Sequence, residues 1–506
     1  MIYLAEITAY NLLTSTVETL RFCTGQGYYD SANHFYEPRI LQPALMRRDI
    51  FGDGQIGGAS QTGYGELTLV NPDGGLDYLG NYAFDGRSLV IKVGEETAAY
   101  ASFVTVLKGT MQQAVMEWQQ VSIRLRDRQA ELSKPVQPLT YAGNNALPNG
   151  LEGVSDIKGA AKPLLLGRCH NVAPVLVNSS RLIYQVTTGT LAELVNVFDK
   201  GAYLARGADY ASQSDMETNT PAAGYFRTWK AGGLFRLGSS PVGQVTCTAW
   251  QYATIEGNTA AQVAYRLVTG PGGISPADTV AADYTLLDSQ NAGNIGLWVS
   301  DGLSVADALD QVCASVGAWW GFDQLGRFRI ARFDAPGGAE VTTLTDVEIL
   351  AIEQERLSVN GEAAPVFKLT LNHDINWTVQ AGDALAGVVP AERKNWLSLA
   401  NRQIVLTDAG VKTHHLLAQE VVYDSLLSGA SVATPEAQRR LNMLKAPTTV
   451  LTVTVRIDTD LIGLIDLGVV VRVQLDRFNL AAGKLFRVIG IETDYQRYQI
   501  ALRLWG

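Results

Sequence analysis

The residues that could do chemistry do not form a complete catalytic or ligand-binding signature. The segment Gly52-Asp53-Gly54-Gln55-Ile56-Gly57 has the spacing G-x-G-x-x-G, which in dinucleotide-binding proteins holds a pyrophosphate at the start of a helix. Here no apolar strand precedes the glycines and no helical pattern follows them. We therefore interpret this segment as a mobile loop and not as a phosphate site.

A second group has the residue types of a calcium loop. Asp458-Thr459-Asp460 is followed by Gly463 and Asp466, but Ile462 and Val469 stand where oxygen ligands are needed. We interpret these residues as strand and turn.

Histidine and cysteine are no better placed to bind a metal. His414 and His415 are adjacent, so their side chains point in different directions, and no third ligand is identifiable. A surface or interface pair is the interpretation we favour. The cysteines are scattered and form no C-x-x-C pair, which favours buried free thiols over a zinc site or a disulfide framework; they are Cys23, Cys169, Cys247 and Cys313.

Other catalytic signatures are missing from the sequence. It contains no G-x-x-x-x-G-K-[ST], no H-E-x-x-H and no G-x-S-x-G, which are the usual marks of nucleotide-binding proteins, metalloproteases and serine hydrolases. We therefore predict no catalytic residue, no metal and no cofactor. A pair of acids able to cleave peptidoglycan stays open, because such pairs meet in space and the chain has 50 carboxylates.

The charge of the chain argues against general binding to nucleic acid. Its net charge is -10, so attraction to phosphates would need a local basic patch. Arg124, Arg126 and Arg128 alternate and would share one face of a strand. We favour a solvated face for them over a binding site.

These residues must be positioned by several domains rich in strands. A chain of 506 residues predicts about three or four domains, and its 49 glycines recur between alternating segments, as is typical where strands meet tight turns. No apolar run is long enough to span a membrane. The N-terminus lacks a basic leader, so we expect synthesis and folding in the cytosol.

The N-terminal part, residues 1–157, is predicted to be a tube-like β domain. Strands are expected at 66–70, 88–93, 103–107 and 118–125, and turn residues punctuate them. Residues 134–159 are rich in Pro, Asn and Gly, which predicts a linker and a domain boundary.

The middle of the chain is predicted to mix helices with strands. Residues 158–300 form an α+β domain, with a helix over 190–201 and strands at 224–229 and 244–250. Residues 301–345 form a helix capped by Ser304 and then a β-hairpin whose aromatic residues pack on that helix.

The C-terminal part, residues 346–506, is predicted to be a β-barrel domain with one helix. Thr434 and Pro435 begin that helix, and four strands follow at 451–457, 469–475, 485–491 and 499–504. We expect these strands to close a small antiparallel barrel. The fold class is thus mainly β with a minor α+β part, multidomain, built of antiparallel barrels or sandwiches with about three short helices.

Several segments resemble phage tail-tip and baseplate proteins, a family of siphovirus-type tail hubs. The segment 304–328, from Ser304 through Trp319-Trp320 to Phe328, is similar to their middle part, as are Asp199-Lys200-Gly201 and Asp209-Tyr210-Ala211. The run from 467 to 506, with Arg477-Phe478-Asn479-Leu480 and Leu502-Arg503-Leu504-Trp505, is similar to their closing barrel. Together these segments cover about half of the chain.

The resemblance implies a structural hub that is not an enzyme. Such a hub is a homotrimer in the virion tail tip, assembled in the host cytoplasm, that adapts the sixfold tail tube to a threefold tip. The implied partners are a distal tail or tube ring, the tape measure protein, and a central fibre or receptor-binding proteins. Viral DNA would pass through during ejection without specific binding, and host attachment would occur below. We expect part of the negative charge to face that channel.

Three alternatives remain open at this stage. Hexameric distal tail proteins share the same barrels, so a hexameric ring competes with the trimer. A tail-tip cell-wall hydrolase is a second alternative. A carbohydrate-binding adhesin is a third, favoured by 20 tyrosines and nine tryptophans that can stack on sugars.

Two segments are candidate assembly contacts. The glycine-rich loop 52–65 suits ordering on assembly. The aromatic ribbon is the other, although we favour core packing for it. The candidate residues are Gly52, Gly54, Gly57, Gly58, Gly63, Gly65, Trp319 and Trp320.

Overall fold

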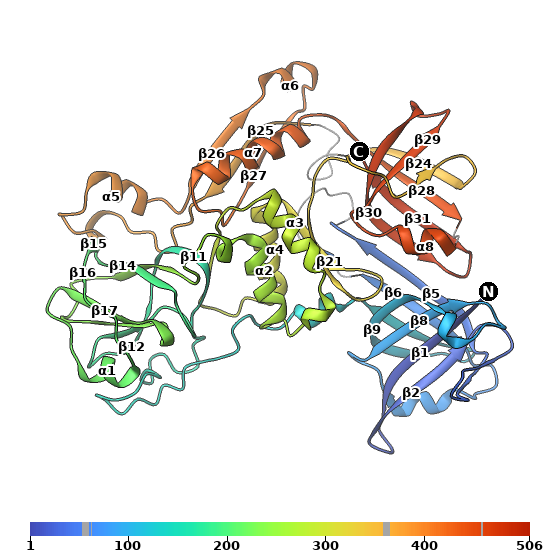
Figure 1. The fold of residues 1–506 in the computed structure, drawn as a ribbon, viewed down its shortest axis with the longest axis horizontal. Coiled ribbons are helices and arrows are strands. Elements are labelled where there is room, and N and C mark those ends of the chain that lie inside the picture. Colours follow the sequence, from blue (N-terminus) through green and yellow to red (C-terminus); the bar gives the residue numbers. More distant parts are fainter. Residues whose placement is uncertain (53–59, 62, 358–364, 457–458) are drawn as a thin grey trace.

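The computed structural model is mainly β and has several domains, as the sequence predicts. It describes residues 1–52, 60–61, 63–357, 365–456 and 459–506. In Figure 1 the N-terminal strands, drawn in blue, lie beside the C-terminal strands, drawn in red, and the middle of the chain extends away from both.

The N-terminal strand group forms one antiparallel run in the order β2-β1-β8-β9-β10-β6-β5. Apolar residues of alternate positions, such as Ile7, Ile91 and Ile123, meet in one core below this sheet. The bounds are β1 (Ile2–Asn11), β2 (Thr16–Cys23), β5 (Ile40–Asp49), β6 (Tyr64–Val70), β8 (Ser88–Gly94), β9 (Val104–Met116) and β10 (Gln120–Arg126), with the short strands β3 (Tyr28–Tyr29), β4 (Phe35–Tyr36) and β7 (Tyr82–Ala83).

The C-terminal strand group runs in the order β23-β29-β30-β31-β28-β24. Its core contains the alternating residues Leu451, Val453 and Val455 of β28 with Leu502 and Leu504 of β31. The bounds are β23 (Thr343–Leu344), β24 (Ile349–Leu357), β28 (Thr448–Arg456), β29 (Val470–Leu475), β30 (Leu480–Asp494) and β31 (Gln499–Trp505), with α8 (Thr459–Leu464) before β29.

The two strand groups are joined into a single sheet by β5 and β30. These strands pair antiparallel from Gly490↔Asp49 to Asp494↔Leu45. Tyr495, at the end of β30, is buried in the N-terminal core, where its hydroxyl donates to the Val106 carbonyl at 3.3 Å. Residues separated by more than 400 positions in the chain therefore share one continuous backbone ladder.

Two smaller sheets follow in the middle of the chain and share a core. One has the order β15-β14-β19-β11-β20 and the other the order β12-β13-β18-β17-β16. The bounds are β11 (Leu164–Val172), β12 (Val175–Asn178), β13 (Ile183–Gln185), β14 (Glu193–Asp199), β15 (Ala202–Tyr203), β16 (Ala205–Arg206), β17 (Tyr225–Trp229), β18 (Leu234–Leu237), β19 (Val245–Trp250) and β20 (Gly296–Val299), with α1 (Gln213–Thr218) between β16 and β17.

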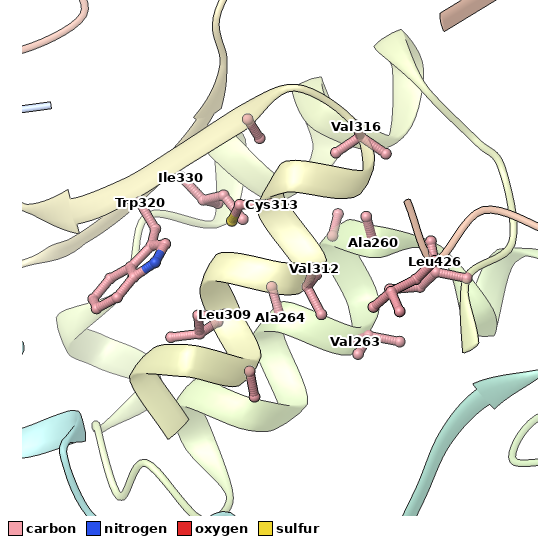
Figure 2. Close-up of a cluster of buried hydrophobic side chains, with 14 of the residues drawn as sticks. Ala260, Val263, Ala264, Leu309, Val312, Cys313, Val316, Trp320, Ile330 and Leu426 are labelled. Atoms are coloured by element: carbon pink, nitrogen blue, oxygen red, sulfur yellow. The ribbon is translucent and has the colours of Figure 1, made fainter. Parts of the chain in front are cut away.

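A helical core lies between the small sheets and the long sheet. Figure 2 shows Leu309, Val312 and Cys313 of α4 (Val305–Ser315) lying among side chains of α2 (Ala260–Thr269), with Trp320 and Ile330 of the hairpin beside them. Burying one such leucine contributes about 2 kcal/mol to stability. The hairpin is β21 (Ala318–Phe322) and β22 (Phe328–Arg332), and α3 (Ala281–Gln290) packs on β22.

A three-stranded sheet completes the fold and packs on α7. In Figure 1 the α6 end of this unit projects from the molecule. The bounds are β25 (Val366–His373), β26 (Arg402–Thr407), β27 (Gln419–Tyr423), α5 (Ala391–Leu397), α6 (Ala409–His414) and α7 (Ala430–Leu444). Short 3-10 turns are η1 (Asp77–Asn81), η2 (Tyr100–Ser102), η3 (Arg128–Leu132), η4 (Lys230–Gly232), η5 (Glu256–Asn258), η6 (Pro276–Asp278) and η8 (Gly382–Ala384).

The predicted helix over 190–201 is wrong, because β14 occupies this segment. Leu194 and Val197 of β14 pair with Ala249 and Cys247 of β19, and the register shifts between Leu194 and Asn196. This bulge inserts one residue and breaks the alternation, so the apolar residues recur at a spacing that imitates a helix. The predicted helix capped by Ser304 is confirmed as α4. The third predicted helix exists as α7, but its predicted start at Thr434 and Pro435 is wrong, because α7 begins at Ala430 and contains Pro435. The helices α2 and α3 were not expected.

Two C-terminal expectations also need correction. The described strands of the C-terminal group do not close into a barrel, because β30 pairs first with β29 and then, over its second half, with β5 of the N-terminal strand group. The residues interpreted as strand and turn form the short helix α8 from Thr459 onward, and Asp458 lies outside the described residues.

The predicted linker, the described residues 134–159, contains no helix or strand. Val136 is held there by a hydrogen bond from its backbone N–H to the Leu303 carbonyl.

No helix in the described ranges is long and apolar enough to cross a membrane.

Candidate assembly surface

The long sheet has one apolar face and one polar face where its two strand groups meet. On β10, Val121, Ile123 and Leu125 are buried in the N-terminal core, so Arg124 and Arg126 lie on the opposite face. The ladder places Arg126 opposite Tyr64 and Tyr64 opposite Arg47. Across the junction, Arg47 lies opposite Glu492 of β30. A row of polar side chains therefore crosses the junction.

This row lies in a groove of about 660 Å³ over the junction. Its rim includes Tyr64, which is 59% exposed. The lining residues are Leu45, Arg47, Gly63, Tyr64, Gly65, Glu66, Gln112, Arg124, Leu125, Arg126 and Glu492. Two of the glycines singled out from the sequence, Gly63 and Gly65, thus line the same groove as the arginines of β10.

The groove contains arginines together with the carboxylates of Glu66 and Glu492, and the charge of Arg126 also acts on Asp127. Arg47 donates to Asp49 at 2.8 Å, and the Glu66 carboxylate accepts from the Ser122 hydroxyl at 2.9 Å. Across the ranges that the structure describes, Arg124 and Arg126 make no side-chain hydrogen bond and no ion pair within 4 Å. Because a free guanidinium binds carboxylates in a fork geometry, this surface suits acidic groups of another chain.

Gly63 is fixed at the groove by a buried carboxylate. Its N–H donates to Asp127 Oδ2 at 2.6 Å, while the Gln129 N–H donates to Asp127 Oδ1 at 2.9 Å. Burial raises the pKa of Asp127 to about 6, although these two hydrogen bonds favour the charged form. The end of the glycine-rich loop is therefore anchored.

Gly65 is required by the close approach of β5 and β6. A Cβ atom on it would lie 2.1 Å from the carbonyl oxygen of Leu45. The register between β5 and β6 shifts at this point, which brings the two backbones together.

The aromatic ribbon is buried, in agreement with the packing interpretation. Trp319 is 5% exposed and Trp320 is 2% exposed. The Trp320 indole N–H donates to Asp310 at 2.7 Å, and the backbone N–H of Ser60 donates to the same carboxylate at 3.2 Å. The structure thus brings the end of the glycine-rich loop onto the ribbon, so the two candidate segments are neighbours.

The remaining loop glycines are placed only in part. Gly52 is half-buried beside Phe51. Gly54, Gly57 and Gly58 lie outside the described residues, as does most of the G-x-G-x-x-G segment.

Sequence reasoning missed β2 and β24, which end the main path of the long sheet, while β23 ends its side branch through β29. β2 is bridged to Glu37 only at Phe22, and Val17 in its other half is 58% exposed. On β24, Leu350 is 48% exposed. An edge strand with exposed apolar residues is ready to pair with another chain. Neither strand alternates between apolar and polar residues, so the sequence carries no clear signal for these edges.

The other chemical candidates gain no site in the structure. His414 ends α6, and among the described residues no three His, Cys, Asp or Glu side chains could hold a metal ion. All four cysteines are free and buried, and burial raises the pKa of the Cys169 and Cys313 thiols. They therefore act as small apolar core residues.

Comparison with known proteins gives structural likenesses only. No protein-family model and no curated protein matches the sequence. A tail protein from Neisseria meningitidis is similar over 95% of each chain, with 12% identity and a TM-score of 0.42. The 43 kDa tail protein of a Shewanella oneidensis prophage is similar over 93% of this chain and 95% of that one, with 12% identity and a TM-score of 0.41.

A prophage tail protein from Listeria monocytogenes is similar over 99% of this chain and 94% of its own, with 9% identity and a TM-score of 0.37. All three of these solved structures are of tail proteins, two of them from prophages, and the likeness is one of fold.

Proposed function

We propose that this protein is a structural, non-enzymatic hub of a phage tail tip, located in the virion and active as a homotrimer. The observation that carries this proposal is the fusion of two β strand groups into one sheet through β5 and β30. Each chain then supplies two β units side by side. Three chains supply six, which is the number needed to face a sixfold tail tube.

The two ends of the sheet support assembly into a ring. β2 ends the N-terminal strand group and β24 ends the C-terminal strand group, and both expose apolar side chains. If β24 of one chain lies against β2 of the next, a heterologous contact repeats around the ring until it closes. Closure hides edges that would otherwise pair without control.

The polar face at the junction supports a channel through which DNA passes without specific binding. Arg47 and Arg503 both form ion pairs with Asp49, at 2.8 and 3.3 Å. Paired charges leave little net field to hold phosphates. Among the described residues that line the groove, Arg124 and Arg126 are the arginines without an ion pair within 4 Å. In this proposal Arg124 and Arg126 bind acidic groups of a neighbouring chain. Part of the net charge of -10 faces the channel.

The predicted division of the chain follows from the same proposal. Residues 1–157 supply one β unit, and the strands β24 and β28 to β31 within 346–506 supply the other. The strands β25 to β27 with α7 share the core of α2 and α4, so they join 158–300 and 301–345 in the part below the ring. The half-buried Gly52 and the groove glycines Gly63 and Gly65 are the proposed contacts with the tube ring. The tape measure protein and a central fibre or receptor-binding protein are the further partners, which would serve DNA ejection and host attachment.

The experiment is the native mass of the purified chain over a concentration series. A trimer of about 164 kDa, three times the 54.6 kDa chain, supports the hub. A hexamer would replace the hub by a distal tail ring. A monomer at every concentration would contradict the ring closure proposed for the free protein.

A further inference from the structure

A second cleft, far in sequence from the assembly surface, combines aromatic rings with free polar groups. It has a volume of about 490 Å³ and lies between the sheet of β14, β19 and β11 on one side and α5 with the ends of β25 and β26 on the other. This volume is in the range of pockets that bind small ligands. Its lining includes Asn196, Tyr203, Thr248, Trp250, Glu392 and Trp396.

Two arginines pack against the aromatic rings of the cleft. Arg168 lies 4.1 Å from the ring centre of Trp250. The Arg393 guanidinium lies 3.8 Å from the ring centre of Phe198 and 5.0 Å from that of Tyr203. It also lies 6.0 Å from the ring centre of Trp396. Tyr203 nevertheless remains 61% exposed. The rings are therefore fixed before any ligand arrives, which lowers the entropy lost on binding.

The polar groups of the cleft are available to a ligand. Within the described chain, the side chains of Asn196, Thr248 and Glu392 make no hydrogen bond and no ion pair. Together they offer an amide, a hydroxyl and a carboxylate, which can both donate to and accept from hydroxyl groups.

The charges of the cleft balance. Asp374 and Glu392 contribute two negative charges, and Arg393 and Arg402 contribute two positive ones. Asp374 is already engaged, because the Gly429 N–H donates to it at 2.6 Å. The Nε2 atom of His170 and the Ser428 hydroxyl form a hydrogen bond of 2.9 Å. Burial lowers the pKa of His170, so this side chain adds no charge at neutral pH. The cleft therefore has no electrostatic preference for an ionic ligand.

We propose that this cleft binds a neutral, hydroxyl-rich saccharide. The exposed ring of Tyr203, with the half-buried rings of Trp250 and Trp396, stacks on the apolar faces of sugar rings. Asn196, Thr248 and Glu392 hydrogen-bond the sugar hydroxyls. The proposal is independent of the trimer, since all of these residues belong to one chain.

The test is a titration of the full-length protein with three trisaccharides. Maltotriose and the trimer of N-acetylglucosamine are the neutral probes, and a trimer of galacturonate is the anionic probe. Binding is followed by calorimetry and by saturation-transfer NMR. We expect at least one neutral probe to bind at millimolar concentration and the anionic probe to bind more weakly.

Variants connect the binding to the cleft. Tyr203→Ala is expected to weaken the affinity about tenfold, whereas Tyr203→Phe keeps the ring and the affinity. Glu392→Gln, at an exposed position, tests the polar side. Trp118→Ala is the matched control, because Trp118 is 91% exposed and lies outside the cleft.

Three results would overturn the proposal. One is the absence of binding by both neutral probes. Another is a preference for galacturonate. The last is neutral-sugar binding that Tyr203→Ala and Glu392→Gln both leave unchanged. Circular dichroism of each variant verifies that it is folded.

Discussion

At the residue scale, the carboxyl group of Asp127, which accepts a hydrogen bond from the Gly63 N–H, makes the stability of the fold depend on pH. Its pKa is raised to about 6 by burial, above the ordinary value of 3.8. The folded chain therefore binds this proton more tightly than the unfolded chain does. The contribution of Asp127 to the free energy of unfolding is fully present below pH 3.8 and is lost as the pH rises through 6.

Asp127→Asn should remove this contribution. We expect the difference in free energy of unfolding between the wild type and this variant to change by about 2 kcal/mol between pH 4 and pH 7, with the wild type relatively more stable at pH 4. Urea denaturation at several pH values measures it. Asp85→Asn, at an exposed position, is the control. Equal pH profiles for the wild type and Asp127→Asn would contradict the assignment.

A second residue-scale prediction concerns Glu436 of α7. Its side chain is 1% exposed and accepts from Arg440 Nε at 2.7 Å, and the Arg440 side chain is itself only 5% exposed. Glu436→Gln leaves the guanidinium buried without its counter-charge, which we expect to cost about 3 kcal/mol of stability.

Thermal and urea unfolding of Glu436→Gln measure this loss. Glu420→Gln is the matched control, because Glu420 pairs with Lys368 at the surface, where water screens the pair. Equal losses for the two variants would show that burial of the pair is not the cause.

At the scale of elements, α4 was predictable because its signals are local. Ser304 caps it: the Asp307 N–H donates to the Ser304 hydroxyl at 3.1 Å. The apolar residues that follow at helical spacing are buried. By contrast, α3 buries only Tyr284 and Leu287, so its apolar pattern is too weak to predict a helix. In β14 the bulge changes the spacing of the apolar residues, so the sequence predicted a helix where a strand forms.

The cap of α4 gives a prediction at this scale. Ser304→Ala removes the acceptor for the Asp307 N–H and should lower the free energy of unfolding by about 1 kcal/mol. Ser304→Thr keeps a hydroxyl and should restore most of it. Chemical denaturation of both variants is the measurement, and equal stability of the Ala and Thr variants would contradict the role of the cap.

The candidate groove could be predicted only in part. The alternation of Arg124 and Arg126 placed them on one face, and the glycines at 63 and 65 marked the neighbouring segment. The pairing of β5 with β30 carries no local signal, because its strands are more than 400 residues apart. The groove therefore exists only once that long-range ladder has formed.

At the scale of the whole molecule, the edges of the long sheet determine whether chains can close a ring. Val17 on β2 and Leu350 on β24 are both exposed apolar residues at these edges. A lysine at either position places a charge where the neighbouring chain would have to bury it, which costs several kcal/mol of association energy. It leaves the isolated chain intact, because neither residue is in its core.

Val17→Lys and Leu350→Lys are therefore each expected to shift the native mass from the trimer toward the 54.6 kDa monomer at concentrations where the wild type is a trimer. Val242→Lys is the control, because Val242 is 85% exposed and lies outside the long sheet. Because the contact is heterologous, one wild-type edge persists in each variant, so mixing the two variants should yield dimers but no larger ring. Trimers that survive both substitutions would place the interface elsewhere on the chain.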